Sequence, residues 1–258
     1  MRITCIERVL IATPSIEASR QQWVRAGFAI APNQRELGEV RFAGLAAGAI
    51  EIDLCEPAGV DATPLGGAVA EAASRGGGII GWTWGVAPGE RQPDTPVQLP
   101  GAEASALPQG LNGVFTAARA VTADHNARCR LHRETFGSNP NTVEYLDHIV
   151  VMAPVLADAI ATHEALGIPC KRIREVGNGT RQAFFKLERT VIEVAGPTRD
   201  RAGCWGLAFM CGDIARAVAV AREKGLSVTE PKKAVQGGRI ARIVDLIDGV
   251  SIAFMQAP

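Results

Sequence analysis

The sequence repeats itself, and this repetition restricts the fold more than any other feature. Residues 6–28 and 146–168 each begin with a short apolar segment, reach a proline and continue into an amphipathic stretch. Each stretch then stops at a glycine, Gly27 or Gly167, that is followed by an apolar residue. An apolar spacing near 3.6 residues predicts a helix after each strand, with the glycine at the helix end. Such repetition is typical of a chain built from copies of one supersecondary unit.

Each predicted helix is followed by a pair of segments in which apolar and polar residues alternate. These segments are residues 40–54, which turn at Gly48, and residues 181–195, which turn near Glu188. Alternation with a central turn predicts antiparallel strand pairs. The chain therefore contains βαβββ-type modules, and the third module, residues 145–197, is the most clearly marked.

Two further copies of the module are weaker. Residues 203–225 predict a strand, a helix capped by Asp213 and a stop at a glycine, and residues 239–255 predict a hairpin around Asp248-Gly249. Residues 78–87 predict the opening strand of the second module, but residues 88–110 are rich in Pro, Gly and Gln where its helix should follow. We therefore expect the second module to lack its helix and to end in a strand around Arg130-Leu131-His132.

These modules predict an α+β protein with curved mixed sheets. We expect residues 1–140 to hold modules one and two and residues 141–258 to hold modules three and four, with residues 137–142 as the link.

Composition narrows the class of partner. The chain carries 27 basic and 27 acidic residues, so no strong field attracts nucleic acid or an acidic membrane. No apolar run reaches the roughly 20 residues that span a bilayer, and Glu7 and Arg8 interrupt the apolar N-terminus. Six scattered cysteines without a CxxC pair are typical of reduced thiols. We expect a cytoplasmic monomer or homodimer that binds a small molecule.

The segments LDHIVVMAP, RQAFFKLERTVIEVAGP and WGLAFMCGDIARAVA resemble the glyoxalase/bleomycin-resistance/extradiol-dioxygenase (vicinal oxygen chelate) superfamily, and the resemblance covers nearly the whole chain. It implies a four-module protein whose sheets curl into half-open cups. It also implies a divalent metal ion (Fe, Mn, Zn, Ni or Co) held by the first and last strands of each module. The fold hosts many reactions, so the resemblance specifies the reaction poorly.

Carried over by position, the ligands survive in only part of the chain. The third module offers His148 and Glu193, and the second offers Gly81 and His132. The remaining positions are Arg8 and Glu51 in module one and Gly206 and Ala253 in module four.

Module pairing decides the ligand set. If modules three and four share a cup, only His148 and Glu193 remain. If modules two and three share one, His132 joins them in a two-His, one-carboxylate site, and Arg8 and Glu51 form an ion pair elsewhere. We favour the second arrangement because it groups every surviving ligand.

Several other residues are candidates for the same site. Arg181 or Arg239 could clamp a substrate carboxylate, and a solvated arginine is the favoured alternative for each. Gln236 lies in the turn before the last hairpin, Trp205 could line a pocket or pack in the core, and Tyr145 could donate to an oxyanion.

The favoured function is a metal-dependent lyase or isomerase acting on a small carbonyl, enol or aromatic compound, with Glu193 and Tyr145 as catalytic residues. The alternatives are a ring-cleaving dioxygenase, a metal-free binder of apolar small molecules, and a metal-free enzyme with Glu193 as base and His148 as acid. A carboxylate such as Glu193 in an apolar strand requires a cation, either a metal ion or an arginine.

Overall fold

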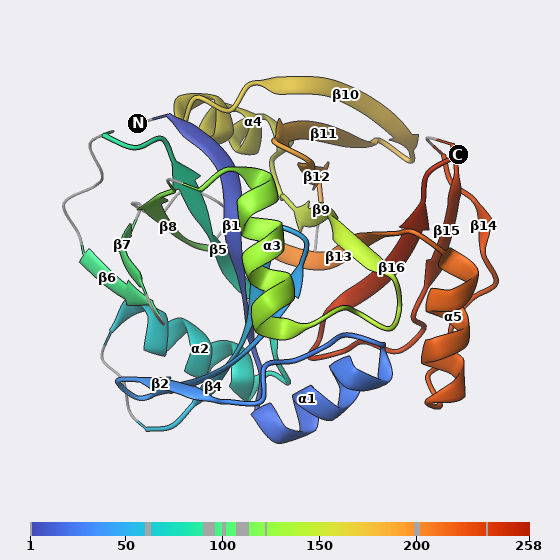
Figure 1. Ribbon diagram of the computed structural model, residues 1–258. Helices are drawn as coiled ribbons and strands as arrows, with labels where there is room; N and C mark the ends of the chain where they lie inside the picture. The colour runs from blue at the N-terminus through green and yellow to red at the C-terminus, as the bar shows by residue number, and fades with distance from the viewer. Residues whose placement is uncertain are drawn as a thin grey trace.

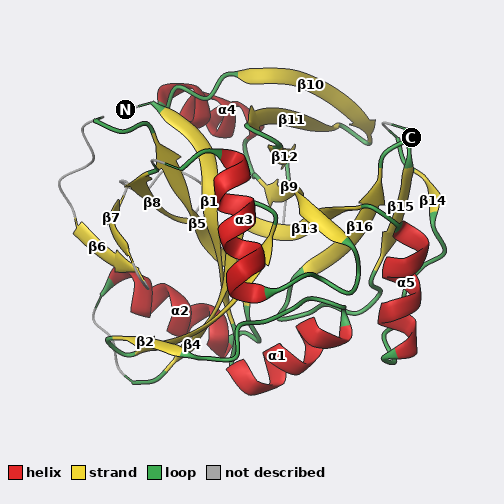
Figure 2. Ribbon diagram, in the orientation of Figure 1, coloured by secondary structure: helices red, strands yellow, loops and turns green. Residues whose placement is uncertain are grey.

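The computed structural model describes residues 2–59, 63–89, 96–99, 102–106, 114–121, 123–198, 202–235 and 237–258. The strands form two curved sheets of eight strands each, and the helices pack against these sheets (Figure 1, Figure 2).

The first half of the chain opens with the predicted strand, helix and strand pair. They are β1 (Ile3–Ala12), α1 (Ile16–Arg25), β2 (Arg35–Leu37), β3 (Val40–Ala47) and β4 (Ile50–Pro57). Helix α2 (Pro64–Ser74) precedes the second module, which comprises β5 (Gly78–Val86), β6 (Pro96–Leu99), β7 (Ala102–Ala106) and β8 (Phe115–Ala120), and helix α3 (His125–Phe136) follows it.

The second half repeats the plan. The third module comprises β9 (Val143–Met152), α4 (Leu156–Ala165), β10 (Cys170–Gly177), β11 (Thr180–Leu187) and β12 (Thr190–Gly196). The fourth comprises β13 (Gly203–Cys211), α5 (Ile214–Glu223), β14 (Lys232–Lys233), β15 (Arg239–Arg242) and β16 (Ser251–Gln256).

Capping residues, glycines and turn residues in the sequence correctly predicted where several of these elements begin and end. Asp213 caps α5, because its side chain accepts from the Arg216 backbone N–H, and Gly27 and Gly167 have the positive φ expected after a helix. The hairpin turn between β15 and β16 contains Asp248 and Gly249, both at positive φ, as in a type I′ turn. The predicted loss of a helix after β5 falls largely on residues outside the described ranges. The predicted fold class is confirmed.

The favoured module pairing is wrong. The first sheet has the order β2-β3-β4-β1-β5-β8-β7-β6 and the second β10-β11-β12-β9-β13-β16-β15-β14. Modules one and two therefore share one sheet, and modules three and four share the other. The join within each half is antiparallel, between β1 and β5 and between β9 and β13.

The predicted strand around His132 is also wrong, because residues 125–136 form helix α3. Asp124 accepts from the Ala127 backbone N–H at 2.8 Å and starts the helix. The segment lacks the alternation of a half-buried strand, and of the side chains of α3 only Arg128 is buried.

One hydrophobic core joins the two halves. Trp23 and Phe28 of the first half make edge contacts with Phe209 of β13, at ring-centroid distances of 6.4 and 4.9 Å. Asp248 of the last hairpin accepts hydrogen bonds from Ser19 and from Trp23 Nε1 of α1. The larger hydrophobic cluster is therefore built from both halves of the chain.

Helices α2 and α3 cover the concave face of the first sheet. Leu65 and Val69 of α2 pack against Leu10 and Phe42, on the inner side of β1 and β3. Helix α3 crosses in front of β1 and β5 (Figure 1). The second half has only residues 197–202 between β12 and β13, where the first half has α2 between β4 and β5. The first cup is therefore partly filled by its own chain.

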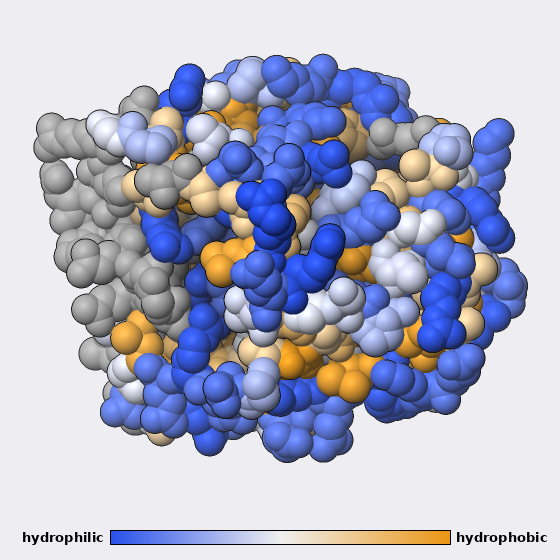
Figure 3. Space-filling model, in the orientation of Figure 1, coloured by the Kyte–Doolittle hydropathy of each residue, from blue (hydrophilic) through white to orange (hydrophobic). Residues whose placement is uncertain are grey.

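The surface in Figure 3 is mostly hydrophilic, with small scattered apolar groups. Among the helices of the described residues, none combines the length and the apolar character needed to cross a membrane.

Candidate functional site

The open cup of the second half brings together His148 and Glu193. His148 lies on β9 opposite Val191 of β12, and Glu193 lies two residues further along the same parallel pair, opposite Val150. Side chains two residues apart on a strand share a face. Both therefore point into the cup, where they line a cavity of about 460 Å³, and both also line an adjoining cavity of about 590 Å³.

Glu193 is held by an amide rather than directly by a cation. Its carboxylate accepts from Gln182 Nε2, and Gln182 Oε1 in turn accepts from Arg174. Burial raises the pKa of Glu193, and His148, Arg174 and Arg172 oppose the shift. A carboxylate of raised pKa in a cavity is a recognised mark of acid–base function.

His148 is oriented by its neighbour. The ring Nδ1 lies 2.9 Å from Asp147 Oδ2, and the imidazole is only partly exposed. This contact favours the tautomer or imidazolium with a proton on Nδ1. With Nδ1 engaged by Asp147, Nε2 is the ring nitrogen left to act on a bound molecule.

The wall opposite this pair cannot complete a metal site. The corresponding positions of module four are Gly206, opposite Ser251, and Ala253, opposite Ala208. A Cβ at Gly206 would lie 2.6 Å from the Ser251 carbonyl oxygen, so the backbone leaves no room for a side chain there. Catalytic divalent ions ordinarily have three protein ligands, and the described residues contain no cluster of three His, Cys, Asp or Glu able to hold one. This donor set does not fit a firmly held ion.

A cationic rim surrounds the cavity. Arg174 comes from β10, Arg242 from β15, and Lys232 and Lys233 from β14. The remaining lining is largely apolar and consists of Val150, Trp205, Leu207, Ala208, Ala234, Val235, Ile240, Ala253 and Met255. The cup can therefore accept a molecule that is both apolar and negatively charged.

Two more of the predicted residues line these cavities. Trp205 borders the 460 Å³ cavity and is 37% exposed, whereas Tyr145 borders the adjoining one. Arg189 stacks over the Tyr145 ring at 5.4 Å, and burial raises the pKa of the phenol. Their proposed roles in binding and oxyanion stabilisation remain predictions.

The predicted arginine clamps do not reach the cup. Arg181 and Arg239 line neither cavity. On β15, Ile240 and Arg242 face the cavity, so the side chain of Arg239 points to the other face of the sheet. Gln236 lies outside the described residues.

His132 is separated from the other two predicted ligands. Its Nδ1 lies 2.9 Å from the Gly48 carbonyl oxygen, and it borders cavities of the first half. It lies on α3 rather than on the inner sheet, so the predicted convergence of His132, His148 and Glu193 is wrong.

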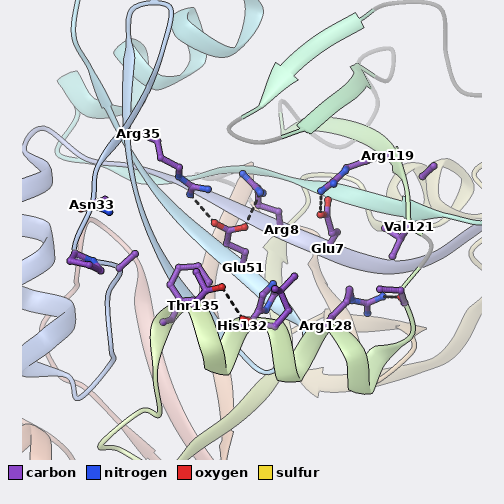
Figure 4. A pocket seen from close by; sticks show the side chains of 16 residues that line it. Glu7, Arg8, Asn33, Arg35, Glu51, Arg119, Val121, Arg128, His132 and Thr135 are labelled. Carbon is purple, nitrogen blue, oxygen red and sulfur yellow. Dashed lines mark hydrogen bonds and ion pairs between the residues drawn. The ribbon is translucent and has the colours of Figure 1, made fainter.

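In the first half, an ion-pair network occupies the ligand positions (Figure 4). Arg8 donates to Glu51 at 2.8 Å and to Asp53 at 2.6 Å, and Arg35 contacts both carboxylates. Arg8 stands opposite Glu51 as His148 stands opposite Val191, so Asp53 is the counterpart of Glu193. The sequence assignment of Glu51 to this position was two residues off, although its ion pair with Arg8 is confirmed.

The network neutralises the floor of a 650 Å³ cavity between the first sheet and α3. Asp53 is fully buried, and this burial raises its pKa to about 6 against the opposing effect of Arg8. At the cavity margin, Arg119 pairs with Glu7 and Arg128 pairs with Glu188. Every arginine of this cavity therefore has a carboxylate partner.

Sequence reasoning missed the cationic rim and the two helices of the first half. Alternation alone would have placed Arg242 on the inner face, since Ala241 is the buried neighbour. Thr63 before Pro64 and Asp124 before His125 were signals for helix starts at α2 and α3.

Comparisons with known proteins agree with this architecture. No family model and no curated protein matches the sequence. A mutant 4-hydroxymandelate synthase from Streptomyces coelicolor superposes with a TM-score of 0.67 over 99% of this chain and 93% of that one, at 14% identity. A xylose isomerase-like TIM barrel/4-hydroxyphenylpyruvate dioxygenase fusion protein gives 0.67 at 15% identity, and the match covers 98% of this chain but only 49% of the fusion. At these identities the likeness concerns the fold, and it confirms that the chain has the glyoxalase-like (vicinal oxygen chelate) fold.

Proposed function

We propose that the second cup is an active site for proton transfer next to the carbonyl group of a small organic molecule. The observation that carries the proposal is a single arrangement. Glu193 is largely buried, hydrogen-bonded to a neutral amide and close to His148 in an open cavity. Burial and placement of this kind prepare a carboxylate to accept a proton near neutral pH.

The proposed reaction uses one of these residues as the base and the other as the acid. The Glu193 carboxylate removes a proton from the carbon next to the carbonyl. The electron pair of that C–H bond forms a C=C bond, and the π pair of the carbonyl group moves to its oxygen. His148, protonated and oriented through Asp147, donates from Nε2 to that oxygen. Return of a proton to the opposite face of the carbon, with the C=O bond re-formed, gives an epimer. If the adjacent carbon carries a leaving group, the enol electron pair instead forms a C=C bond to that carbon and the group departs with its bonding pair, which is a lyase reaction.

The metal-dependent function and the dioxygenase remain the competing candidates. The Asp147 contact favours them, because a carboxylate commonly orients a metal-binding histidine in this way. The incomplete donor set speaks against a resident ion, so no step of the proposed reaction depends on one.

Deuterium exchange tests the proposal without knowledge of the natural substrate. The purified protein is incubated in D2O with a panel of 2-oxo and 3-oxo acids, and exchange next to the carbonyl is followed by NMR, with EDTA and with added divalent ions. Exchange that persists in EDTA and falls at least about 100-fold in Glu193→Gln supports the proposal. Exchange only with an added ion, or oxygen uptake with Fe²⁺, overturns it in favour of a metal-dependent reaction. No exchange under any condition leaves a binding protein.

A further inference from the structure

We infer that the second cup takes an amphipathic organic anion, with its negative head group on the cationic rim and its apolar body against the inner wall. The inference rests on the proposed function only for the location of the reacting carbon, and it specifies the class of molecule that the cup admits.

The cationic residues of the two cups differ in whether they have ion-pair partners. In the first, Arg8, Arg35, Arg119 and Arg128 all pair with carboxylates. In the second, Arg174, Arg242, Lys232 and Lys233 line the cavity, yet none of them forms an ion pair with any described carboxylate. Four cations without such partners, around a cavity whose lining contains one carboxylate, that of Glu193, create a positive field that favours an anion.

Arg174 offers a hydrogen-bond donor that a bound molecule could use. Its Nη2 donates to Gln182, but its Nε is buried and has no hydrogen-bond acceptor among the described residues. A buried donor without an acceptor costs free energy, which an acceptor on a bound molecule would recover. An oxygen of an anionic head group is such an acceptor.

The order of strands in the second sheet explains how cations from distant strands meet at one cavity. Arg174 lies on β10 at one edge of the second sheet, whereas Lys232 and Lys233 lie on β14 at the other edge. A curved sheet brings both edges to one cavity. A head group bound there is contacted by modules three and four together, so binding of the anion requires both modules.

The wall between these edges fits an apolar body. Val150, Leu207, Ile240 and Met255 line the cavity, and Trp205 stands at its margin. A volume of about 460 Å³ lies within the range of small-molecule sites. Burial of apolar ligand surface supplies affinity, and the rim supplies selectivity for charge.

Trp205 provides a built-in reporter. Trp23, Trp82 and Trp84 are fully buried, so a ligand in the cup acts on fluorescence chiefly through Trp205. The test titrates octanoate, the uncharged octanamide and the cationic octylamine into the protein at low salt, with calorimetry as a second readout. Octanoate should give a saturable signal that is lost in Trp205→Phe and should bind at least about tenfold more tightly than octanamide.

Two arginines of one strand give a matched control. Arg242→Gln should weaken octanoate about tenfold and leave octanamide unchanged, whereas Arg239→Gln, on the other face of β15, should change neither. Equal or tighter binding of octanamide or octylamine, or equal effects of the two substitutions, overturns the inference. The titration is repeated in Glu193→Gln. Octanoate binding there, with no exchange in the wild type, upholds the anion site and overturns proton transfer. Exchange without selective octanoate binding does the reverse.

Discussion

Arg8 and His148 occupy the same position in the two halves of the chain, but they face different surroundings. Arg8 stands opposite Glu51 and Thr83 and is clamped between two carboxylates, whereas His148 stands opposite Val191 and Ala208 and faces an open cavity. Arg8 is therefore engaged by ion pairs at the floor of its cavity, whereas His148 remains available to a ligand.

The first prediction concerns the acid limb of the reaction. A base must be ionised to act, and burial raises the pKa of Glu193 above the ordinary glutamate value of 4.5. Proton exchange should therefore be lost, as the pH falls, at a pH above 4.5. A carboxyl-carbon NMR titration, with Glu193→Gln to assign the resonance, measures this pKa directly. Titration at or below the ordinary value would remove the basis for Glu193 as the base.

The second prediction concerns metal binding. Ala253→Glu places a third donor on the inner face near His148 and Glu193. Divalent ions should therefore bind at least about tenfold more tightly than to the wild type. Even residues that only hydrogen-bond to a metal ligand change metal affinity by about 10- to 100-fold. Titration with Zn²⁺, Mn²⁺ and Co²⁺ measures the change. Gly206→His is the control and should fail to gain affinity, because the Ser251 carbonyl oxygen occupies the space for its Cβ. Tight, stoichiometric binding of a divalent ion by the wild type would show that His148 and Glu193 are not its only ligands.

The third prediction concerns the ion-pair network of the first cup. Arg8→Met leaves two buried carboxylates with one fewer cation, and the free energy of unfolding should fall by about 3–5 kcal/mol. Arg35 contacts the same carboxylates but is 35% exposed, so Arg35→Met should cost only about 1 kcal/mol. Urea unfolding compares the two variants. Equal losses would mean that burial does not set the strength of this network.

The fourth prediction concerns the contact between the last hairpin and α1. Asp248→Ala removes the acceptor for Trp23 Nε1 and Ser19, so the free energy of unfolding should fall by about 1–3 kcal/mol. Asp248→Asn keeps an acceptor and tolerates the positive φ of this turn, so it should cost less. Thermal unfolding compares a variant that lacks the acceptor with one that keeps it, and indistinguishable midpoints would contradict the assignment.

The repeated pattern predicted the modules because strand alternation, Asp213 and the helix-ending glycines act locally. The pairing of modules was beyond this reasoning, since it depends on strand joins such as β1 with β5 and β9 with β13, which link different modules. His148 and Glu193 were placed correctly on neighbouring strands, because strand order within one module follows the repeat. His132 was misplaced because a positional match was preferred to the capping signal at Asp124.

The register error at Glu51 has a simple cause. Asp53 lies four residues before Pro57, as Glu193 lies four residues before Pro197, and that spacing was the better guide. The cationic rim was missed for a different reason. Its members lie on strands at opposite edges of the sheet, and only the curvature of the folded sheet brings them to one cavity.

Helix α2 has a consequence for how a duplicated protein divides its work. Because this helix packs on the inner side of β1 and β3, it covers part of the inner face of the first sheet with the chain's own side chains. The second half has no helix at the matching place between β12 and β13, so a molecule of greater length can lie along its sheet. One insertion between two modules is thus enough to give two similar sheets unequal room for a guest.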